Sequence, residues 1–374
     1  MTNYGPKALL GLAGAIAAFG IAGCGDDDSG DSGSADSGDK QGGKIALLLP
    51  ESKTTRYESQ DKPLFEAAVK AGCSDCEVLY SNADQDASKQ QQQAEAAITN
   101  GAKVIVLDPV DAKSAGSIVK RAEQSNIPVI SYDRLVAGGS SPDYYISFDN
   151  EAVGKLQGES LVEQLGGDAA KGKQIVMING SPTDGNAALF KKGAHSVIDG
   201  SGVKIGKEYD TPDWSPDEAQ NQMDQAITAL GKDKIDGVYA ANDGTAGGAI
   251  AAMKSAGMDP TKIPSTGQDA ELAGVQRVLI GEQGMTVYKA IKPEAEKAAQ
   301  LAVALVRGEE PPAGLVNDTT NNGTADIPSI ILDPVAVTSE NVKDTVIADG
   351  FLKAADLCTG KYAAACEEAG ISAS

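Results

Sequence analysis

The sequence predicts an α/β protein made of two doubly wound lobes, and three observations support this fold class. The chain has 374 residues, whereas a single hydrophobic core stops growing at about 250–300 residues, so two domains are expected. From Lys44 onward, short β-rich runs alternate with longer runs that carry apolar residues at helical spacing. Some short runs, such as 104–107, are continuously apolar, which is typical of parallel strands covered on both faces.

Each short run is predicted to form a strand. In chain order the runs are 45–49, 77–80, 104–108, 129–133, 145–148, 175–179, 203–209, 237–241, 265–268, 285–288 and 330–332. Most of the segments between them are predicted to form helices, in which residues such as Ala94, Ala97 and Ile98 share one apolar face. Regular βα alternation implies right-handed crossovers and doubly wound sheets. The expected lobes comprise 44–148 with 289–326, and 149–288 with 327–374.

The first 43 residues are predicted to lie outside the fold. Lys7 precedes an uncharged stretch at 8–22, which is shorter than the ~20 residues of a membrane-spanning helix and suits the core of a signal peptide at 1–23. The stretch ends in Ile21-Ala22-Gly23-Cys24, which resembles the lipobox of bacterial lipoproteins and implies a lipid on Cys24. An uncleaved anchor and an ordinary signal peptide are the alternatives. Residues 24–43 are mostly Gly, Ser and Asp, which predicts a flexible acidic linker to the outer face of the cell membrane.

The four remaining cysteines form two local pairs in the sequence. Cys73 lies near Cys76, and Cys358 lies near Cys366. Four cysteines allow three connectivities, and pairing within each local pair is the simplest. A zinc site and a redox role for Cys73 and Cys76 are the alternatives. Since the N-terminus predicts an exported protein, we expect structural disulfides.

The composition excludes several classes of function. The chain has 53 acidic and 32 basic residues, a formal net charge of -21, so phosphate backbones would repel it and nucleic-acid binding is excluded. Its single histidine, His195, argues against a histidine-rich metal site and against histidine acid–base chemistry. We therefore expect the protein to act without a metal, a cofactor or a catalytic histidine.

Polar and aromatic residues follow several of the predicted strands, where ligands bind in open parallel sheets. They are Arg56, Tyr57, Asp133, Arg134, Asp184, Asn186, Trp214, Asn242, Asp269 and Lys289. Carboxylates accept hydrogen bonds from hydroxyls, Arg and Lys donate to hydroxyl and ring oxygens, and an aromatic face packs on a pyranose ring. The three cations balance three carboxylates, Asp133, Asp184 and Asp269, so the set favours a neutral sugar over a phosphorylated one.

Each of these residues also has a purely structural interpretation. Asp184 and Asp243 could simply cap the helices that follow them. Asp133 and Arg134 could form a surface ion pair of little energetic consequence. A single tryptophan is more often a core residue, although the turn-like sequence 212–216 predicts that Trp214 is exposed. The functional interpretation depends on the convergence of all of them at one end of the sheets.

Several motifs, in order along the chain, resemble the type I solute-binding proteins of sugar ABC importers, and most of all the xylose-binding members. These motifs are Asp133-Arg134, the segments 145–151, 180–182 and 186–187, Ala241-Asn242-Asp243, the segment 245–250, Gly267-Gln268-Asp269-Ala270 and the segment 285–289. The likeness runs from about Lys44 to about Phe351. The chain departs from the pattern at Gly185, where a larger polar residue is expected, and at Tyr57, where a tryptophan is expected.

The resemblance implies a role for each site residue. Arg56, Asp133 and Arg134 would contribute from the first lobe, Lys289 from a hinge strand, and the others from the second lobe, with Trp214 and Tyr57 on either side of the sugar ring. Three segments near Phe148, Tyr288 and Asp326 would let the lobes close on the ligand without chemistry. The expected partners are a neutral monosaccharide, with D-xylose first, and a membrane permease of an ABC importer. The protein is expected to be a monomer.

Three other functions remain open at this point. A secreted glycosidase could use two of the carboxylates, although neighbouring Arg and Lys would lower the pKa that a general acid needs. A sensor lipoprotein could pass its ligand state to a receptor. A binder of another monosaccharide, a furanose or a nucleoside could use the same site. The cysteine pairs and the residues after Phe351 lie outside the resemblance and have no assigned role.

Overall fold

The computed structural model describes residues 42–372. The predicted signal peptide, Cys24 and nearly all of the predicted linker lie outside the described residues. Within 42–372, no helix is both long and apolar enough to cross a membrane. The α/β architecture expected from the alternating runs is confirmed, with most β-sheet pairs parallel.

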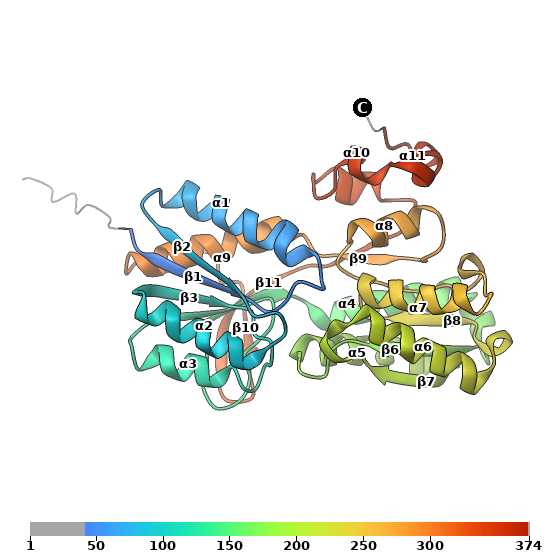
Figure 1. The fold of residues 1–374 in the computed structure, drawn as a ribbon, viewed down its shortest axis with the longest axis horizontal. Coiled ribbons are helices and arrows are strands. Elements are labelled where there is room, and N and C mark those ends of the chain that lie inside the picture. Colours follow the sequence, from blue (N-terminus) through green and yellow to red (C-terminus); the bar gives the residue numbers. More distant parts are fainter. Residues whose placement is uncertain (1–41, 373–374) are drawn as a thin grey trace, which may run out of the picture. The chain divides into compact units, whose positions relative to one another are not determined.

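The first lobe is a seven-stranded sheet covered on both faces. Its strands are β1 (Lys44–Leu49), β2 (Glu77–Asn82), β3 (Ala102–Leu107), β4 (Val129–Tyr132), β5 (Tyr144–Phe148), β10 (Asp318–Asn321) and β11 (Asp326–Leu332), in the order β10-β11-β5-β4-β3-β1-β2. Only the pair of β10 with β11 is antiparallel. The helices are α1 (Lys62–Gly72), α2 (Ala87–Thr99), α3 (Gly116–Glu123) and α9 (Ile291–Val306). Figure 1 shows α1 and α9 on one face and α2 and α3 on the other.

The continuous apolar sequence of β1 follows from this double covering. Successive side chains of a strand point to opposite faces of its sheet. Ile45 and Leu47 belong to the core that includes α1 and α9, whereas Ala46 and Leu48 belong to the core that includes α2 and α3. Both faces of β1 are therefore covered by buried apolar side chains. The residues of β3 are likewise divided between these two cores.

The second lobe is built on a three-stranded parallel sheet. Its strands are β6 (Gln174–Asn179), β7 (Lys204–Asp210) and β8 (Gly237–Ala240), in the order β7-β6-β8. The helices are α4 (Asn150–Gln164), α5 (Gly185–Ser201), α6 (Pro216–Leu230) and α7 (Asp243–Ser255). Met177 packs with residues of α4 and α5, and Val176 packs with residues of α6 and α7. This sheet is thus also covered on both faces.

A smaller region completes the second lobe. It consists of α8 (Leu272–Leu279), the antiparallel pair β9 (Thr286–Tyr288) and β12 (Val335–Val337), and the C-terminal α10 (Ala354–Leu357) and α11 (Ala363–Glu368). Single helical turns lie at η1 (Tyr57–Asp61), η2 (Gly167–Ala170), η3 (Pro212–Trp214), η4 (Lys232–Lys234), η5 (Pro260–Lys262), η6 (Lys343–Ile347) and η7 (Gly360–Tyr362). Disulfides join Cys73 to Cys76 and Cys358 to Cys366, which is the local pairing expected from the sequence.

Two predictions about strands and boundaries are wrong in detail. Residues 265–268 form no strand, and Ser265 makes only an isolated bridge to Val238. Backbone hydrogen bonds join Val238 to Pro264 and Thr266, and the hydroxyl of Thr266 then binds both the N–H and the C=O of Ala240, so the backbone ladder ends after one bridge. All of β11 pairs in the first sheet, so the third connection between the lobes lies after Leu332 and not near Asp326. The division of the chain into lobes otherwise stays a prediction.

Candidate ligand-binding site

A cavity with about 260 Å³ of empty space lies where the two sheets face each other. All ten residues predicted from the strand ends line it: Arg56, Tyr57, Asp133, Arg134, Asp184, Asn186, Trp214, Asn242, Asp269 and Lys289. Thr54, Phe190 and Gln268 line it as well and were not predicted. Residues up to 235 positions apart in the chain therefore meet at one point, as the rule for strand carboxyl ends anticipates.

The turn after β4 places two of the site residues. Asp133 has a left-handed backbone, with φ of 55°, and its N–H donates to Ile146 O at 2.8 Å. The hydroxyl of Ser131 donates to Arg134 O and accepts from Val136 N, which fixes the loop that follows. A non-glycine residue in this conformation is strained and is held by its surroundings, so the turn is tightly specified.

Arg56 is held from behind by two buried acids. Its Nε and Nη2 donate to Asp61 at 3.0 and 2.7 Å, and Nη2 also donates to Glu294 at 3.3 Å. Its Nη1 faces Asp133 at 3.5 Å and Asp269 at 3.7 Å. Burial acts to lower the pKa of Arg56, but Asp133 and Asp61 raise that pKa well above its ordinary value. The guanidinium is therefore a fixed cation with one nitrogen turned toward the cavity.

Lys289 supplies a second cation from the hinge strand. Its Nζ lies 3.3 Å from Asp269 and 3.6 Å from Asp133. Burial alone would lower the pKa of Lys289, yet these two carboxylates raise it. Conversely, burial acts to raise the pKa of Asp133, and Arg56 and Lys289 lower that pKa overall. Arg56, Asp133 and Lys289 are thus charged across the ordinary pH range.

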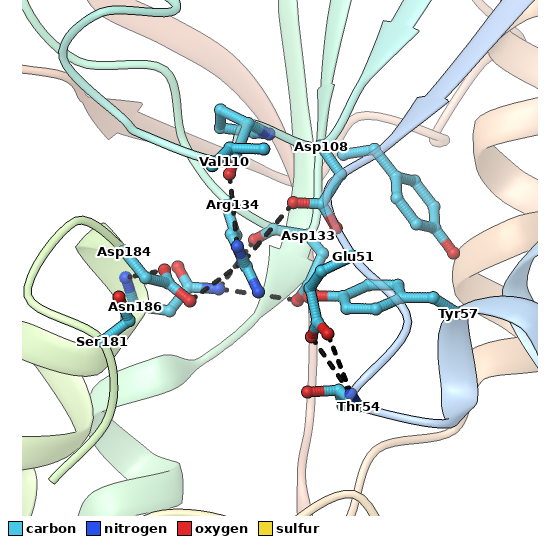
Figure 2. Close-up of polar contacts among 12 residues, drawn as sticks. Glu51, Thr54, Tyr57, Asp108, Val110, Asp133, Arg134, Ser181, Asp184 and Asn186 are labelled. Carbon is cyan, nitrogen blue, oxygen red and sulfur yellow. Dashed lines mark hydrogen bonds and ion pairs between the residues drawn. The ribbon is translucent and has the colours of Figure 1, made fainter. Parts of the chain in front are cut away.

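Arg134 links the two lobes through Asp184. Arg134 Nε lies 2.9 Å from Asp184 Oδ2 and 3.5 Å from Asp108 Oδ1. Figure 2 shows the guanidinium of Arg134 between these carboxylates, with the Tyr57 hydroxyl directed at Asp133, to which it donates at 3.1 Å. Asn186 Nδ2 adds a further link, since it donates to Asp133 O at 3.0 Å.

Two site residues are also helix caps, so the structural and functional interpretations both hold. Asp184 is the N-cap of α5 and accepts from Asn186 N at 2.8 Å. Asn242, and not Asp243, is the N-cap of α7 and forms a capping box with Thr245. Asp243 is buried away from the cavity lining and accepts from Gln283, Thr286 and Glu271.

Trp214 is buried, so the prediction that it is exposed is wrong. Only 4% of its surface is accessible. Its indole Nε1 donates to Asp184 Oδ2 at 3.1 Å, and its ring meets Phe190 edge-on at 6.3 Å. A Cβ at residue 180 would overlap the indole, so Gly180 makes the room that the ring occupies. The turn sequence predicted exposure because it carried no sign of this distant glycine.

Buried acids behind the cavity were missed by the sequence analysis. Asp61, Asp108 and Glu294 are each at most 1% exposed, and they bring six carboxylates against three cations. Burial raises the pKa of Asp108 and of Glu294 well above the ordinary values, which favours their neutral forms. Asp108 ends a predicted strand and could have been found by the strand-end rule. Glu294 lies within a helix, and no pattern links it to Arg56.

The cavity presents atoms that a polyol could satisfy. Among residues 42–372, Arg56 Nη1 and Asp269 Oδ1 are buried and make no hydrogen bond. One is a donor and the other an acceptor, and a hydroxyl group can serve both. Within the same described range, no cluster of His, Cys, Asp and Glu could hold a metal ion. The site is suited to hydrogen bonding of a small polar molecule.

Comparisons with known proteins agree with this geometry. Residues 45–310 match the family described as "Periplasmic binding protein domain". The chain is 39% identical over 318 residues to the D-xylose-binding periplasmic protein of Escherichia coli (84% of this chain, 92% of that one). It is 38% identical to the protein of the same description from Haemophilus influenzae (82% and 90%). A solute-binding protein from Clostridium phytofermentans, solved with bound β-D-glucose, superposes with a TM-score of 0.76 at 31% identity (84% and 99%). These similarities confirm the fold class predicted from the sequence.

Proposed function

The chain belongs to the type I periplasmic binding proteins of sugar ABC importers, a family of binding proteins and not of enzymes, and we propose that it captures a neutral monosaccharide in this cavity. D-xylose is the first candidate because two relatives that align with most of the chain are described as D-xylose-binding proteins. D-glucose is the second, because a solved relative at 31% identity contains it. A glycosidase is not proposed.

The observation that carries the proposal is the set of polar groups that meet in the cavity. Arg56 Nη1 and Asp269 Oδ1 have no hydrogen-bond partner there, and Trp214 and Tyr57 add aromatic surface. Of the cavity-lining residues, three cations face three carboxylates, so a neutral ligand leaves the balance undisturbed. Both atoms have ion-pair partners at 3.3–3.7 Å, and hydroxyl groups of a sugar would add the hydrogen bonds that they lack.

Binding would close the two lobes, and the closed form would be recognised by a permease. Contacts across the cavity, such as Arg134 with Asp184 and Asn186 with Asp133, join the first lobe to the second. They can form only when the lobes approach, which is the basis of hinge closure in binding proteins. A lipid on Cys24 and the linker 24–43 would keep a monomeric protein at the outer face of the membrane.

Calorimetric titration of the protein with D-xylose, D-glucose, D-ribose, L-arabinose and D-galactose tests the proposal. We expect micromolar or tighter binding of one or two of these sugars and no binding of D-xylose 5-phosphate, whose charge would upset the balance. The proposal fails if none of the neutral sugars binds. A deletion strain that grows normally on the bound sugar would favour sensing over transport.

A further inference from the structure

The C-terminal residues 338–372, called here the C-terminal cap, pack against the chain neighbours of two cavity-lining residues, Asp269 and Lys289. A buried apolar cluster joins Val342, Val346 and Leu357 of the cap to Ala270 and Tyr288. The disulfide between Cys358 and Cys366 lies in the same cluster. Figure 1 shows α10 and α11 next to α8. The matched family region ends at residue 310, so the cap lies beyond it.

Tyr288 connects the cap to Lys289. Tyr288 is the last residue of β9, and Lys289 follows it directly. The Tyr288 ring packs against Phe351 with centroids 5.0 Å apart, and its hydroxyl donates to Asp349 Oδ2 at 3.1 Å. The Lys289 ammonium lies on the other side, between Asp133 and Asp269. The cap thus packs against Tyr288, and the next residue, Lys289, lines the cavity.

Ala270 connects the cap to Asp269 in the same way. Asp269 and Ala270 both have left-handed backbones, with φ of 87° and 48°. Non-glycine residues keep this conformation only where their surroundings enforce it. Asp269 N donates to Val287 O at 2.8 Å, and Ala270 is fully buried in the cap cluster. The turn that presents Asp269 is therefore clamped between β9 and the cap.

The cap also reaches the first lobe. Gln60 Nε2 donates to Phe351 O at 3.1 Å. Gln60 belongs to η1, which begins at Tyr57 and ends at Asp61, the acid that holds Arg56. Arg56 and Asp269 line both the cavity and an outer groove with about 1380 Å³ of empty space, which Phe351, Leu352 and Lys353 also line. Phe351 therefore touches the hinge strand with its ring and the first lobe with its backbone.

We infer that the C-terminal cap is a positioning element for the ligand site, and that Phe351 is its central residue. The cap orients Lys289 and Asp269 from behind and adds a contact across the lobes in the closed form. No residue of the cap is among those that line the cavity. This inference rests on the proposed sugar-binding function. Its consequence is that damage to the cap lets the bound sugar escape faster.

The test compares variants inside the cap with a matched control. Phe351→Ala removes the ring under Tyr288, and Tyr288→Phe removes only the hydrogen bond to Asp349. Gln276→Ala is the control, because Gln276 Nε2 donates to Leu357 O at 3.2 Å and so ties the cap to α8, whereas the contacts of Phe351 tie it to Tyr288 and Gln60. D-xylose dissociation is followed by stopped-flow fluorescence of Trp214, the only tryptophan of the chain. Thermal unfolding of each variant accompanies the kinetics.

We expect Phe351→Ala to raise the D-xylose dissociation rate about tenfold while the association rate changes less than about threefold. Tyr288→Phe should raise it by about threefold, Gln276→Ala should leave it within about twofold, and Phe351→Leu should recover most of the loss. A purely structural cap would lower the unfolding temperature of Phe351→Ala and Gln276→Ala alike and leave both dissociation rates unchanged. That result would overturn the inference.

A sugar-free measurement separates this inference from the proposed function. If the wild-type protein binds none of the five sugars, the proposed function fails, and the cap is then tested by acrylamide quenching of Trp214 without ligand. Greater quenching in Phe351→Ala than in Gln276→Ala would still support positioning of the cavity wall by the cap. Equal quenching in the two variants would refute it.

Discussion

On the first-lobe wall of the cavity, charged side chains are held by other buried charges, whereas on the second-lobe wall polar side chains are held by helix N-termini and by packing. Arg56 is fixed by Asp61 and Asp133. Asp184 and Asn242, by contrast, cap α5 and α7 with their own side chains. The first wall therefore depends on electrostatic pairing, and the second on the secondary structure that it also stabilises.

The difference predicts how each wall fails. Removing one partner of a buried ion pair leaves the other charge uncompensated. Removing a cap or an aromatic ring leaves an unsatisfied helix end or a space. Substitutions in the first wall should therefore act on stability through charge, and those in the second through packing and helix ends. Four variants test this contrast.

The largest effect is expected for Arg56→Met. The change keeps an apolar stem but leaves Asp61, Asp133 and Glu294 without their shared cation. We expect a loss of about 3–5 kcal/mol in the free energy of unfolding, measured by urea denaturation, and no detectable sugar binding. Arg121→Met, at an exposed site of α3, is the control and should change stability by less than about 0.5 kcal/mol. A stable Arg56→Met variant would mean that the acids neutralise themselves by taking up protons.

Trp214→Ala should have the next largest effect. The ring is buried against Phe190, and its Nε1 donates to Asp184, so we expect a loss of about 3 kcal/mol in stability as well as at least tenfold weaker sugar binding. Trp214→Phe keeps a ring without the donor and should retain most of the stability. Calorimetry and thermal unfolding measure the two quantities. Unchanged affinity in Trp214→Ala would remove this residue from the site.

Asp269→Asn should weaken binding with little loss of stability. The amide keeps the shape of the side chain and Lys289 keeps Asp133 as a partner at 3.6 Å, so the folded state has no new orphan cation. The charge-assisted hydrogen bond to a sugar hydroxyl is lost, and we expect about tenfold weaker binding by calorimetry. Asp168→Asn, at an exposed position, is the matched control. Equal affinity in both variants would place Asp269 outside the ligand contacts.

The sequence predicted the residues that line the cavity, but it did not predict the contacts that hold those residues in place. All ten predicted residues line the cavity, because strand ends are local features that a parallel sheet gathers at one edge. The supporting contacts were not predictable in the same way. Glu294 and Arg56 meet across 238 positions, and Gly180 accommodates Trp214 through the absence of a side chain. Such pairings depend on tertiary packing and leave no local pattern.

The fold shows the same division. Long apolar strands such as β1 and β3 were predicted because both of their faces are buried. β10 has the polar sequence Asp318-Thr-Thr-Asn321 and lies at the edge of its sheet, paired only with β11. β12 has three residues and pairs only with β9. Strands of this kind are stabilised by their partners and not by their own hydrophobicity, so periodicity alone did not reveal them.

The smallest effect on stability is expected for Glu271→Gln, at the residue that joins the two walls at the edge of the cavity. Its Oε1 accepts from Thr55 N of the first lobe at 2.8 Å. Burial, together with Asp243 and Asp269, raises the pKa of Glu271 to about 8, whereas a solvated glutamate titrates near 4.3. If opening of the lobes returns Glu271 to water, closure takes up a proton between these two values. Closure, and sugar binding with it, then becomes less favourable as the pH rises from about 5 to about 8, and is constant above that range.

The pH dependence of calorimetric affinity checks this coupling. The wild-type affinity should fall as the pH rises from 5 to 8, by at most about tenfold per pH unit for one proton. Glu271→Gln cannot take up the proton, so its affinity should be flat over the same range and close to the wild-type affinity at pH 5. Glu123→Gln, at an exposed position of α3, should keep the wild-type slope. An equal slope in Glu271→Gln would show that another group takes up the proton, because the amide oxygen still accepts from Thr55 N and keeps the contact between the walls.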